Sequence, residues 1–386
     1  MKMPISSIPC QAPCGTLKGK KILCVIGTRP EAIKMAPVVK ALKARGFTVS
    51  ILATAQHRGL LDQMLETFEL RADWDLDLMR PDQGLAELTG IMIPKLDKLF
   101  RDFCPNAILA QGDTTTVFCS ALAAFYSRVP FGHVEAGLRS GNLDAPFPEE
   151  AMRKLTAVLS RWHFAPTATS AEALLREGYP DHSIHVVGNT VIDSLLEVAN
   201  REDLSWPDGI PKLGAGERLV LVTLHRRESF GEPLRRILES LRDFAMDHKE
   251  ARLVYPVHPN PNVRAPVGQI LGEVPNVNLI EPVEYCVLVG LMKEAFLVFT
   301  DSGGIQEEAP ALGKPVLVFR ESTERPEIVS QGGAVLVGSD PQRFLQEVES
   351  LWNSPEKYRQ MARARFPYGD GTASLKIAEI LAKDLQ

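Results

Sequence analysis

Short apolar runs alternate with amphipathic segments along most of this chain, and this alternation limits its fold more than any other feature. The first apolar run covers residues 21–27, and residues 32–45 follow with apolar side chains at helical spacing. Strands and helices alternate in this way when parallel strands are joined by right-handed helical crossovers. Further strands are expected at 49–53, 107–110, 131–135 and 162–165, and helices at 57–68, 114–126, 149–160 and 170–177.

The alternation stops over residues 200–217, where Pro and Gly favour turns, and then restarts. The second half predicts strands at 219–223, 253–257, 277–280, 296–300, 315–319 and 334–337, with helices that include 232–246, 284–294 and 303–312. We therefore expect an α/β protein with two doubly wound, Rossmann-like domains of similar size that face each other across a cleft.

Composition excludes several classes of protein. The formal net charge of -5, from 43 basic and 48 acidic residues, argues against a nucleic-acid-binding protein. No apolar run approaches the ~20 residues that a membrane-spanning helix needs. The six cysteines are scattered and no metal-binding motif occurs, so we expect no metal, no membrane partner and a reducing, cytoplasmic environment.

Ligands of open α/β sheets bind beyond the carboxyl ends of the strands, and the polar residues of the first half gather there. Arg29 and Lys34 follow the first strand at the start of a helix, where an anion is favoured, although exposed basic residues on a capped helix explain them equally well. Asp113, Glu135 and Glu149 stand at three other strand or helix ends. Together they predict proton transfer in one pocket, although Asp113 alone is a common N-cap residue and Glu149 alone is a common partner of a helix dipole.

The second half carries two further candidate clusters. His225 follows the strand at 219–223 and is a candidate acid/base group or phosphate partner. The turn Ser302-Gly303-Gly304 lies between a strand and a helix, where backbone N–H groups bind a diphosphate, and Glu308 follows one turn later. Neither G-x-G-x-x-G after the first strand nor G-x-x-x-x-G-K-[ST] occurs, which weighs against a dinucleotide oxidoreductase and a P-loop NTPase.

Seven motifs in this order resemble the non-hydrolysing UDP-N-acetylglucosamine 2-epimerases: GTRPEAIKMAP, QGDTTT, HVEAGLRSG, PEEAMR, HRRESFGEP, YPVHPNPNV and TDSGGIQEEAPALGKPV. Residues 1–19 lack the apolar core of a secretory signal and are expected to form a flexible tail. The resemblance implies the two-domain fold of GT-B glycosyltransferases, with an N-terminal domain over 20–188, a UDP-binding domain over 189–365 and a C-terminal helix in 366–386 that returns to the first domain.

The resemblance also implies reversible epimerisation at C2 of UDP-GlcNAc, through elimination of UDP to a 2-acetamidoglucal and re-addition. It implies no redox cofactor, no metal, a homodimer and a role in cell-envelope polysaccharide synthesis. The catalytic residues that match the family motifs are Asp113, Glu135, Glu149 and His225. The residues expected to bind the UDP-sugar are Arg29, Lys34, Asp113, Glu135, His225, Val283, Leu288, Ser302, Gly303, Gly304, Glu308 and Arg325.

Two regions depart from the family pattern or match it only in part. Val283 stands where the uracil-side loop usually has Gln, and Leu288 stands where it has Phe, so side-chain stacking on the base by Phe is lost. Gln56, Arg226 and His258 resemble parts of an allosteric site that some bacterial members use.

Three alternatives to the epimerase stay open at this stage. One is a hydrolysing relative that releases ManNAc and UDP, and a second is a GT-B glycosyltransferase. The third is a nucleotide-sugar-binding regulator without turnover, which has no need for four acid/base groups. Replacing Asp113 by Asn separates an enzyme from such a regulator, since turnover falls while binding is kept.

Overall fold

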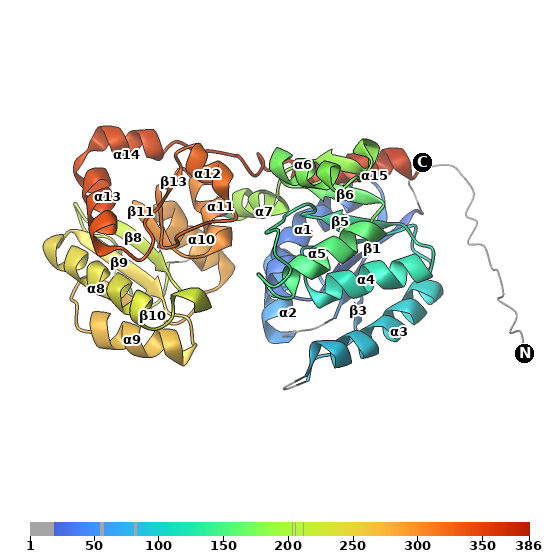
Figure 1. Ribbon diagram of the computed structural model, residues 1–386, viewed down its shortest axis with the longest axis horizontal. Helices are drawn as coiled ribbons and strands as arrows, with labels where there is room; N and C mark the ends of the chain where they lie inside the picture. The colour runs from blue at the N-terminus through green and yellow to red at the C-terminus, as the bar shows by residue number, and fades with distance from the viewer. Residues whose placement is uncertain (1–18, 55–57, 81–82, 203, 205, 211) are drawn as a thin grey trace, which may run out of the picture. The chain divides into compact units, whose positions relative to one another are not determined.

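The computed structural model describes residues 19–54, 58–80, 83–202, 204, 206–210 and 212–386. It divides into two compact units, and we call them the N-terminal and the C-terminal unit. The N-terminal unit comprises the described residues up to Ser194 together with Gly369–Gln386, and the C-terminal unit comprises Leu195–Tyr368. Each unit contains one parallel sheet with helices around it (Figure 1).

The sheet of the N-terminal unit has the strand order β3-β2-β1-β4-β5-β6-β7, and all its pairings are parallel. β1 is a central strand with five of its six residues buried, which explains its continuous apolar sequence. The strand order reverses between β1 and β4, so the loops after these two strands border the expected ligand crevice. The strands are β1 (Lys21–Ile26), β2 (Thr48–Ala53), β3 (Trp74–Asp75), β4 (Ala107–Gln111), β5 (Phe131–Val134), β6 (Trp162–Ala165) and β7 (Ile184–Val186).

The helices of this unit form two packed groups, as expected for a doubly wound sheet. One group has α1 against α2 and α15, and the other has α3 against α4 and α4 against α5. Their bounds are α1 (Arg29–Ala44), α2 (Arg58–Thr67), α3 (Leu85–Phe103), α4 (Thr115–Tyr126), α5 (Glu149–Leu159), α6 (Ala168–Arg176), α7 (Thr190–Ala199) and α15 (Ala373–Asp384). α7 runs across the division between the two units.

The helix α3, 19 residues long, was not predicted from the sequence. Pro94 lies inside it, and a proline is normally a signal against a helix interior. The helix is held instead by an apolar stripe at four-residue spacing, Leu88, Met92, Leu96 and Phe100, all of which are buried. Tertiary packing therefore overrides the local signal.

The sheet of the C-terminal unit has the order β10-β9-β8-β11-β12-β13, again wholly parallel. Its order reverses between β8 and β11, which makes the loops after these strands the counterparts of those after β1 and β4. The strands are β8 (Arg218–Thr223), β9 (Ala251–Pro256), β10 (Val277–Ile280), β11 (Leu297–Thr300), β12 (Val316–Val318) and β13 (Ala334–Leu336). The helices are α8 (Glu232–Asp247), α9 (Pro261–Leu271), α10 (Tyr285–Glu294), α11 (Gly303–Ala311), α12 (Pro326–Ser330), α13 (Pro341–Asn353) and α14 (Pro355–Met361).

The last helix, α15, is part of the N-terminal unit, where it packs along α1. In Figure 1 it is the red helix among the blue and green elements of that unit. Asp193 fixes its start, because the buried carboxylate accepts hydrogen bonds from the backbone N–H groups of Ala373 and Ser374 and from the Ser374 hydroxyl. The division between the units falls after Ser194 and after Tyr368.

Within the residues that the structure describes, no helix combines the length and the apolar character that crossing a membrane requires.

Candidate active site

A first polar cluster surrounds Glu135, directly after β5. Its carboxylate pairs with Lys34 of α1 at 2.5 Å and accepts hydrogen bonds from the side chains of Gln111 and Asn189. Its φ of 65° lies in the left-handed region, which costs a residue with a Cβ about 1–2 kcal/mol. β5 thus ends at Val134, one residue earlier than predicted. The structure brings Lys34 and Glu135, both predicted site residues, into direct contact.

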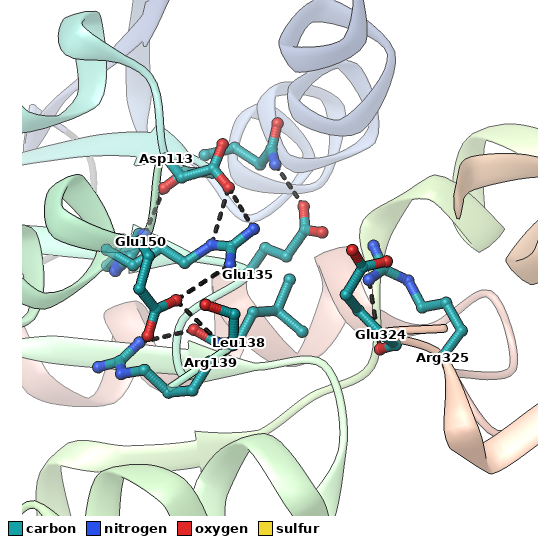
Figure 2. A network of polar contacts seen from close by, with 12 residues as sticks. Asp113, Glu135, Leu138, Arg139, Glu150, Glu324 and Arg325 are labelled. Atoms are coloured by element: carbon teal, nitrogen blue, oxygen red, sulfur yellow. Dashed lines mark hydrogen bonds and ion pairs between the residues drawn. The ribbon is translucent and has the colours of Figure 1, made fainter. Parts of the chain in front are cut away.

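A second cluster holds Asp113, which follows β4. Arg153 of α5 contacts Asp113 Oδ2 with both Nε and Nη2, each at 2.8 Å, and reaches Glu150 with Nη1 at 3.2 Å. Glu150 is fully buried and also accepts the backbone N–H groups of Ser140 and Gly141. In Figure 2, dashed lines join Asp113 and Glu150 to the guanidinium group that lies between them. An ion-paired chain therefore links the predicted acid to the loop after β5.

Sequence reasoning missed Arg153 and Glu150. It named the neighbouring Glu149, which is the first residue of α5 and is half-buried. Glu150 and Arg153 are three residues apart in one helix, so they lie on the same side of it, but this spacing does not tell which side faces inward. The catalytic role of Glu149 stays a prediction.

Glu31 joins the loops after β1 and β4. Its buried carboxylate accepts the Gly27 N–H at 2.6 Å and the Thr114 hydroxyl at 2.8 Å. Burial raises the pKa of Glu31 to about 7, with a smaller contribution from the charge of Asp113, while the hydrogen bonds act in the opposite direction. Arg29, the predicted phosphate-binding cation, lies exposed two residues earlier at the start of α1.

His133 of β5 contacts the backbone of the loop that carries Asp113. Its Nε2 lies 2.7 Å from the Gly112 carbonyl oxygen, and because a carbonyl only accepts, Nε2 carries the proton of this bond. The side chain is 1% exposed, and this burial lowers the pKa of His133 to about 4. The imidazole is therefore neutral near pH 7 and fixes the residue that precedes Asp113.

In the C-terminal unit, Asp301 organises the loop after β8. The Asp301 carboxylate, 1% exposed, accepts the backbone N–H groups of His225 and Arg226 through the same oxygen, each at 2.8 Å. Burial raises its pKa, although nearby positive charge and these bonds oppose the shift. The ring of His225 stacks on that of His258, with centroids 5.6 Å apart and planes at 14°. Predicted catalytic and allosteric residues thus lie together here.

The Gly-rich turn leads into α11, as predicted. Ser302 is the N-cap residue, and Gly303 has the guanidinium groups of Arg226 and Arg325 nearby. Arg325, the N-cap residue of α12, forms an ion pair with Glu307 of α11, which the sequence did not reveal because the two residues belong to different elements. This pair orients the guanidinium beside the turn.

Glu308, the predicted ribose-binding acid, is buried in α11 and accepts a hydrogen bond from the hydroxyl of Tyr285 at 2.7 Å. Tyr285 is the first residue of α10, between the two positions that depart from the family pattern. Val283 precedes the helix and Leu288 lies within it, both half-buried. Gln56 lies outside the described residues, so an allosteric role for Gln56, Arg226 and His258 stays a prediction.

Over the described ranges, no group of three or more His, Cys, Asp or Glu side chains is arranged to hold a metal ion.

The family profile described as UDP-N-acetylglucosamine 2-epimerase matches residues 40–382. The UDP-N-acetylglucosamine 2-epimerase of Escherichia coli strain K12 is 51% identical over 370 residues, which are 94% of this chain and 98% of that protein. The chain belongs to the UDP-N-acetylglucosamine 2-epimerase family. The enzyme of that name from Neisseria meningitidis serogroup A is 48% identical over 370 residues, which are 94% of this chain and 100% of that protein.

Solved structures of family members agree with this assignment. The UDP-GlcNAc 2-epimerase of Neisseria meningitidis, bound to UDP-GlcNAc, matches with a TM-score of 0.88 and 47% identity over 94% of this chain and 100% of that chain. The Methanocaldococcus jannaschii enzyme, in complex with UDP-GlcNAc and UDP, matches with a TM-score of 0.78 and 31% identity over 94% and 99% of the two chains. The predicted family and the prediction of an isomerase are confirmed.

A more distant structure bears on the fold alone. The glycotransferase of kitacinnamycin is 14% identical, with a TM-score of 0.67 over 96% of this chain and 100% of that chain. Together with the two parallel sheets, this likeness confirms the predicted GT-B-like α/β fold class.

Proposed function

We propose that this epimerase interconverts UDP-N-acetylglucosamine and UDP-N-acetylmannosamine by inverting C2 of the sugar. The observation that carries the proposal is the 51% identity to the Escherichia coli enzyme over 94% of the chain. The structures of relatives bound to UDP-GlcNAc support the same substrate. Asp113 and Glu135, on loops after neighbouring strands, supply acid/base groups in one region of the N-terminal unit.

The proposed reaction first removes the C2 proton to a base. The electron pair of that C–H bond forms the C1=C2 double bond, the C1–O bond breaks, and UDP leaves with its electron pair. UDP then adds back to C1 of the 2-acetamidoglucal while a proton is delivered to the opposite face of C2. This needs acid/base groups on two sides of the sugar, and Asp113, Glu135, Glu149 and His225 are the candidates.

Two basic residues hold these carboxylates in place before substrate binds. The Arg153 guanidinium holds Asp113, and the Lys34 ammonium holds Glu135, so neither acid has to reorient when substrate arrives. Preorganised groups of this kind stabilise developing charge without a reorganisation cost in the transition state.

The charge of the leaving UDP requires donors and cations. The start of α11 offers backbone N–H groups from the Ser302–Gly304 turn, and Arg325 lies beside it. Arg29, exposed at the start of α1, supplies a cation from the N-terminal unit. Glu308 binds the ribose hydroxyls in this proposal, with its carboxylate held by Tyr285.

The test is incubation of the pure protein with UDP-GlcNAc in D2O, followed by proton NMR. We expect UDP-ManNAc to appear and deuterium to enter C2. Free ManNAc and UDP as the products would assign the chain to hydrolysing enzymes instead. Asp113→Asn is expected to lose turnover and keep UDP binding, whereas Asp102→Asn makes the same chemical change at an exposed carboxylate of α3 and leaves turnover intact.

We further propose that the enzyme acts as a homodimer. Two packed helices of the N-terminal unit expose large apolar side chains near their ends, Phe125 and Tyr126 on α4 and Leu155 and Val158 on α5. Exposed apolar patches of this kind support association. Sedimentation velocity should give twice the chain mass of 42.5 kDa, and Val158→Asp should shift the protein to the single-chain mass. A parent protein that sediments as one chain would refute the proposal.

A cytoplasmic location is also proposed, since the buried cysteines Cys24 and Cys119 are free thiols. Cell fractionation tests it: recovery outside the cytoplasmic fraction would contradict it. Cys10 and Cys14 lie outside the described residues.

A further inference from the structure

The reaction above uses Asp113, Glu135, Glu149 and His225 and gives no task to a further buried carboxyl, that of Glu31. This side chain is 2% exposed and lies in the first turn of α1. A glutamate in the first turn of a helix normally stays solvated at the surface, where its charge interacts favourably with the helix dipole. Glu31 instead lies inside the N-terminal unit, and burial of an ionisable group needs specific partners.

Those partners come from the loops after β1 and β4, the two strands between which the strand order reverses. Gly27, at the end of β1, donates its N–H to Glu31 Oε2 at 2.6 Å. Thr114, between Asp113 and α4, donates its hydroxyl to Glu31 Oε1 at 2.8 Å. The backbone N–H of Glu31 itself contacts the Thr28 hydroxyl oxygen at 3.4 Å. One carboxyl thus ties the end of β1 to the start of α4.

The residues around Gly27 and Thr114 are packed closely, so the contacts of Glu31 cannot shift without moving its neighbours. A Cβ added at Gly27 would meet Thr116 Oγ1 at 2.5 Å and Thr54 Oγ1 at 3.0 Å, so the loop after β1 already packs against the first turn of α4 and the end of β2. The Thr114 oxygen also caps α4 by accepting the Val117 N–H at 3.4 Å. Moving Glu31 therefore moves Thr114, the N-cap residue of α4, and with it the adjacent Asp113.

We propose that Glu31 is a positioning residue of the epimerase reaction, which fixes Asp113 by clamping Gly27 to Thr114. The proposal rests on the proposed function, because Asp113 matters only if this chain epimerises. Glu31 acts through Thr114 and touches no substrate, so it is not a catalytic residue.

The clamp has two protonation forms with different hydrogen bonding. The ionised carboxylate accepts from both Gly27 and Thr114. When it is protonated on Oε1, the new O–H points at the Thr114 oxygen, and the Thr114 hydroxyl proton has to turn away. The Gly27 N–H has no such choice, since it only donates. The cap of α4 therefore differs between the two forms.

Near neutral pH both forms are populated, because burial raises the pKa of Glu31 to about 7. The charged group that acts on this carboxyl is Asp113, on the loop after β4, and it raises the pKa further. The other groups that face it, Gly27 and Thr28 on its own loop and Thr114 at α4, are uncharged. We therefore expect kcat to fall as the pH is lowered through about 7, as the clamp changes form.

The experiment compares four variants of the full chain. Glu31→Gln presents an N–H group in place of one acceptor and so resembles the protonated form at every pH. Thr114→Val removes the hydroxyl partner, and Thr114→Ser restores it. Asp193→Asn is the matched control, because Asp193 is also a buried carboxylate of the N-terminal unit with a raised pKa, but it fixes α15. For each, kcat and KM for UDP-GlcNAc are measured from pH 5.5 to 9, together with Tm.

We expect Glu31→Gln and Thr114→Val to lower kcat at pH 8 by about 10- to 100-fold, the loss typical of a misplaced catalytic group, with KM changed less than about threefold. Glu31→Gln should lack the fall of kcat near pH 7, and Thr114→Ser should recover most of the rate. Asp193→Asn should lower Tm while keeping the parent kcat and pH profile well below its Tm.

Three results would overturn the proposal: a Glu31→Gln enzyme with the parent kcat and pH profile, an Asp193→Asn enzyme with the same altered profile, or Thr114→Val and Thr114→Ser with equal rates. If Glu31→Gln does not fold, the two Thr114 variants decide the question. An inactive parent protein is a separate result, which refutes the proposed function and is read without any variant.

Discussion

Replacing Glu150 by Gln tests whether the buried member of the Glu149-Glu150 pair holds the Asp113 network together. Glu150 Oε2 accepts the Ser140 N–H at 3.0 Å and Arg153 Nη1 at 3.2 Å, while Oε1 accepts the Gly141 N–H at 3.2 Å. A Gln side chain has one acceptor oxygen, so its better orientation keeps the two donors at Oε2 and turns an NH2 group toward the Gly141 N–H.

The expected cost follows from this count. One hydrogen bond to a charged acceptor is lost, at about 1.5–3 kcal/mol, and the remaining two weaken because the acceptor becomes neutral, at about 1 kcal/mol together. We therefore expect Glu150→Gln to lower the free energy of unfolding by about 3 kcal/mol. Glu149→Gln, one residue away and half-buried, should lower it by less than about 0.5 kcal/mol.

The assay is urea unfolding followed by circular dichroism, with both variants and the parent fitted to the same m-value. Turnover of UDP-GlcNAc is measured on the same samples in the absence of urea. Glu149→Gln separates the two roles, since a catalytic Glu149 lowers kcat without lowering stability. A Glu150→Gln protein within about 1 kcal/mol of the parent would refute the reasoning, because the three contacts would then contribute little.

Three further predictions follow from other contacts. Between pH 4.5, the ordinary pKa of Glu31, and about 7, its raised pKa, the folded protein keeps a proton on Glu31 that the unfolded chain releases. This group therefore lowers the free energy of unfolding by about 3 kcal/mol in total as the pH rises through that window. The difference in unfolding free energy between the parent and Glu31→Gln should show that slope, and a difference that does not change with pH would contradict the prediction. Tyr285→Phe removes the hydroxyl that donates to Glu308, and isothermal titration calorimetry should show UDP binding weakened about 5- to 30-fold; unchanged affinity would remove Glu308 from the ribose site. Asp301→Asn keeps one oxygen for both backbone N–H groups, so urea unfolding should show it about 2 kcal/mol more stable than Asp301→Ala, and equal stabilities would mean that these bonds carry no weight.

The fold class was predictable because each central strand is a buried, continuous apolar run. Lys21–Ile26 is the clearest case, since a strand covered on both faces has no polar side to alternate with. α3 was missed although its buried residues, from Leu88 to Phe100, recur at four-residue spacing; Pro94 inside it is a local signal against a helix. Boundaries shifted by one to three residues: α1 begins at Arg29 rather than at residue 32, and β5 ends before Glu135, a left-handed residue.

The candidate site was predictable at the level of loops, because polar residues after the central strands of parallel sheets converge in space. Which of two adjacent glutamates turns inward was not, since that depends on the donors of the loop after β5 that face Glu150. The pairing of Arg325 with Glu307 and the burial of Glu31 depend on contacts between chain segments that carry no shared local pattern. The sequence thus predicted which types of residue the site contains, but it did not predict which side chains they contact.

The position of α15 affects the order in which the two units can fold during translation. The N-terminal unit is assembled from residues up to Ser194 and from Gly369–Gln386, so its own helix α15 is translated only after the whole C-terminal unit. Until α15 leaves the ribosome, the face of α1 that it covers and the buried carboxylate of Asp193 lack their partners. We expect the C-terminal unit, whose chain is continuous, to complete folding before the N-terminal unit, which becomes protease-resistant only once α15 has left the ribosome.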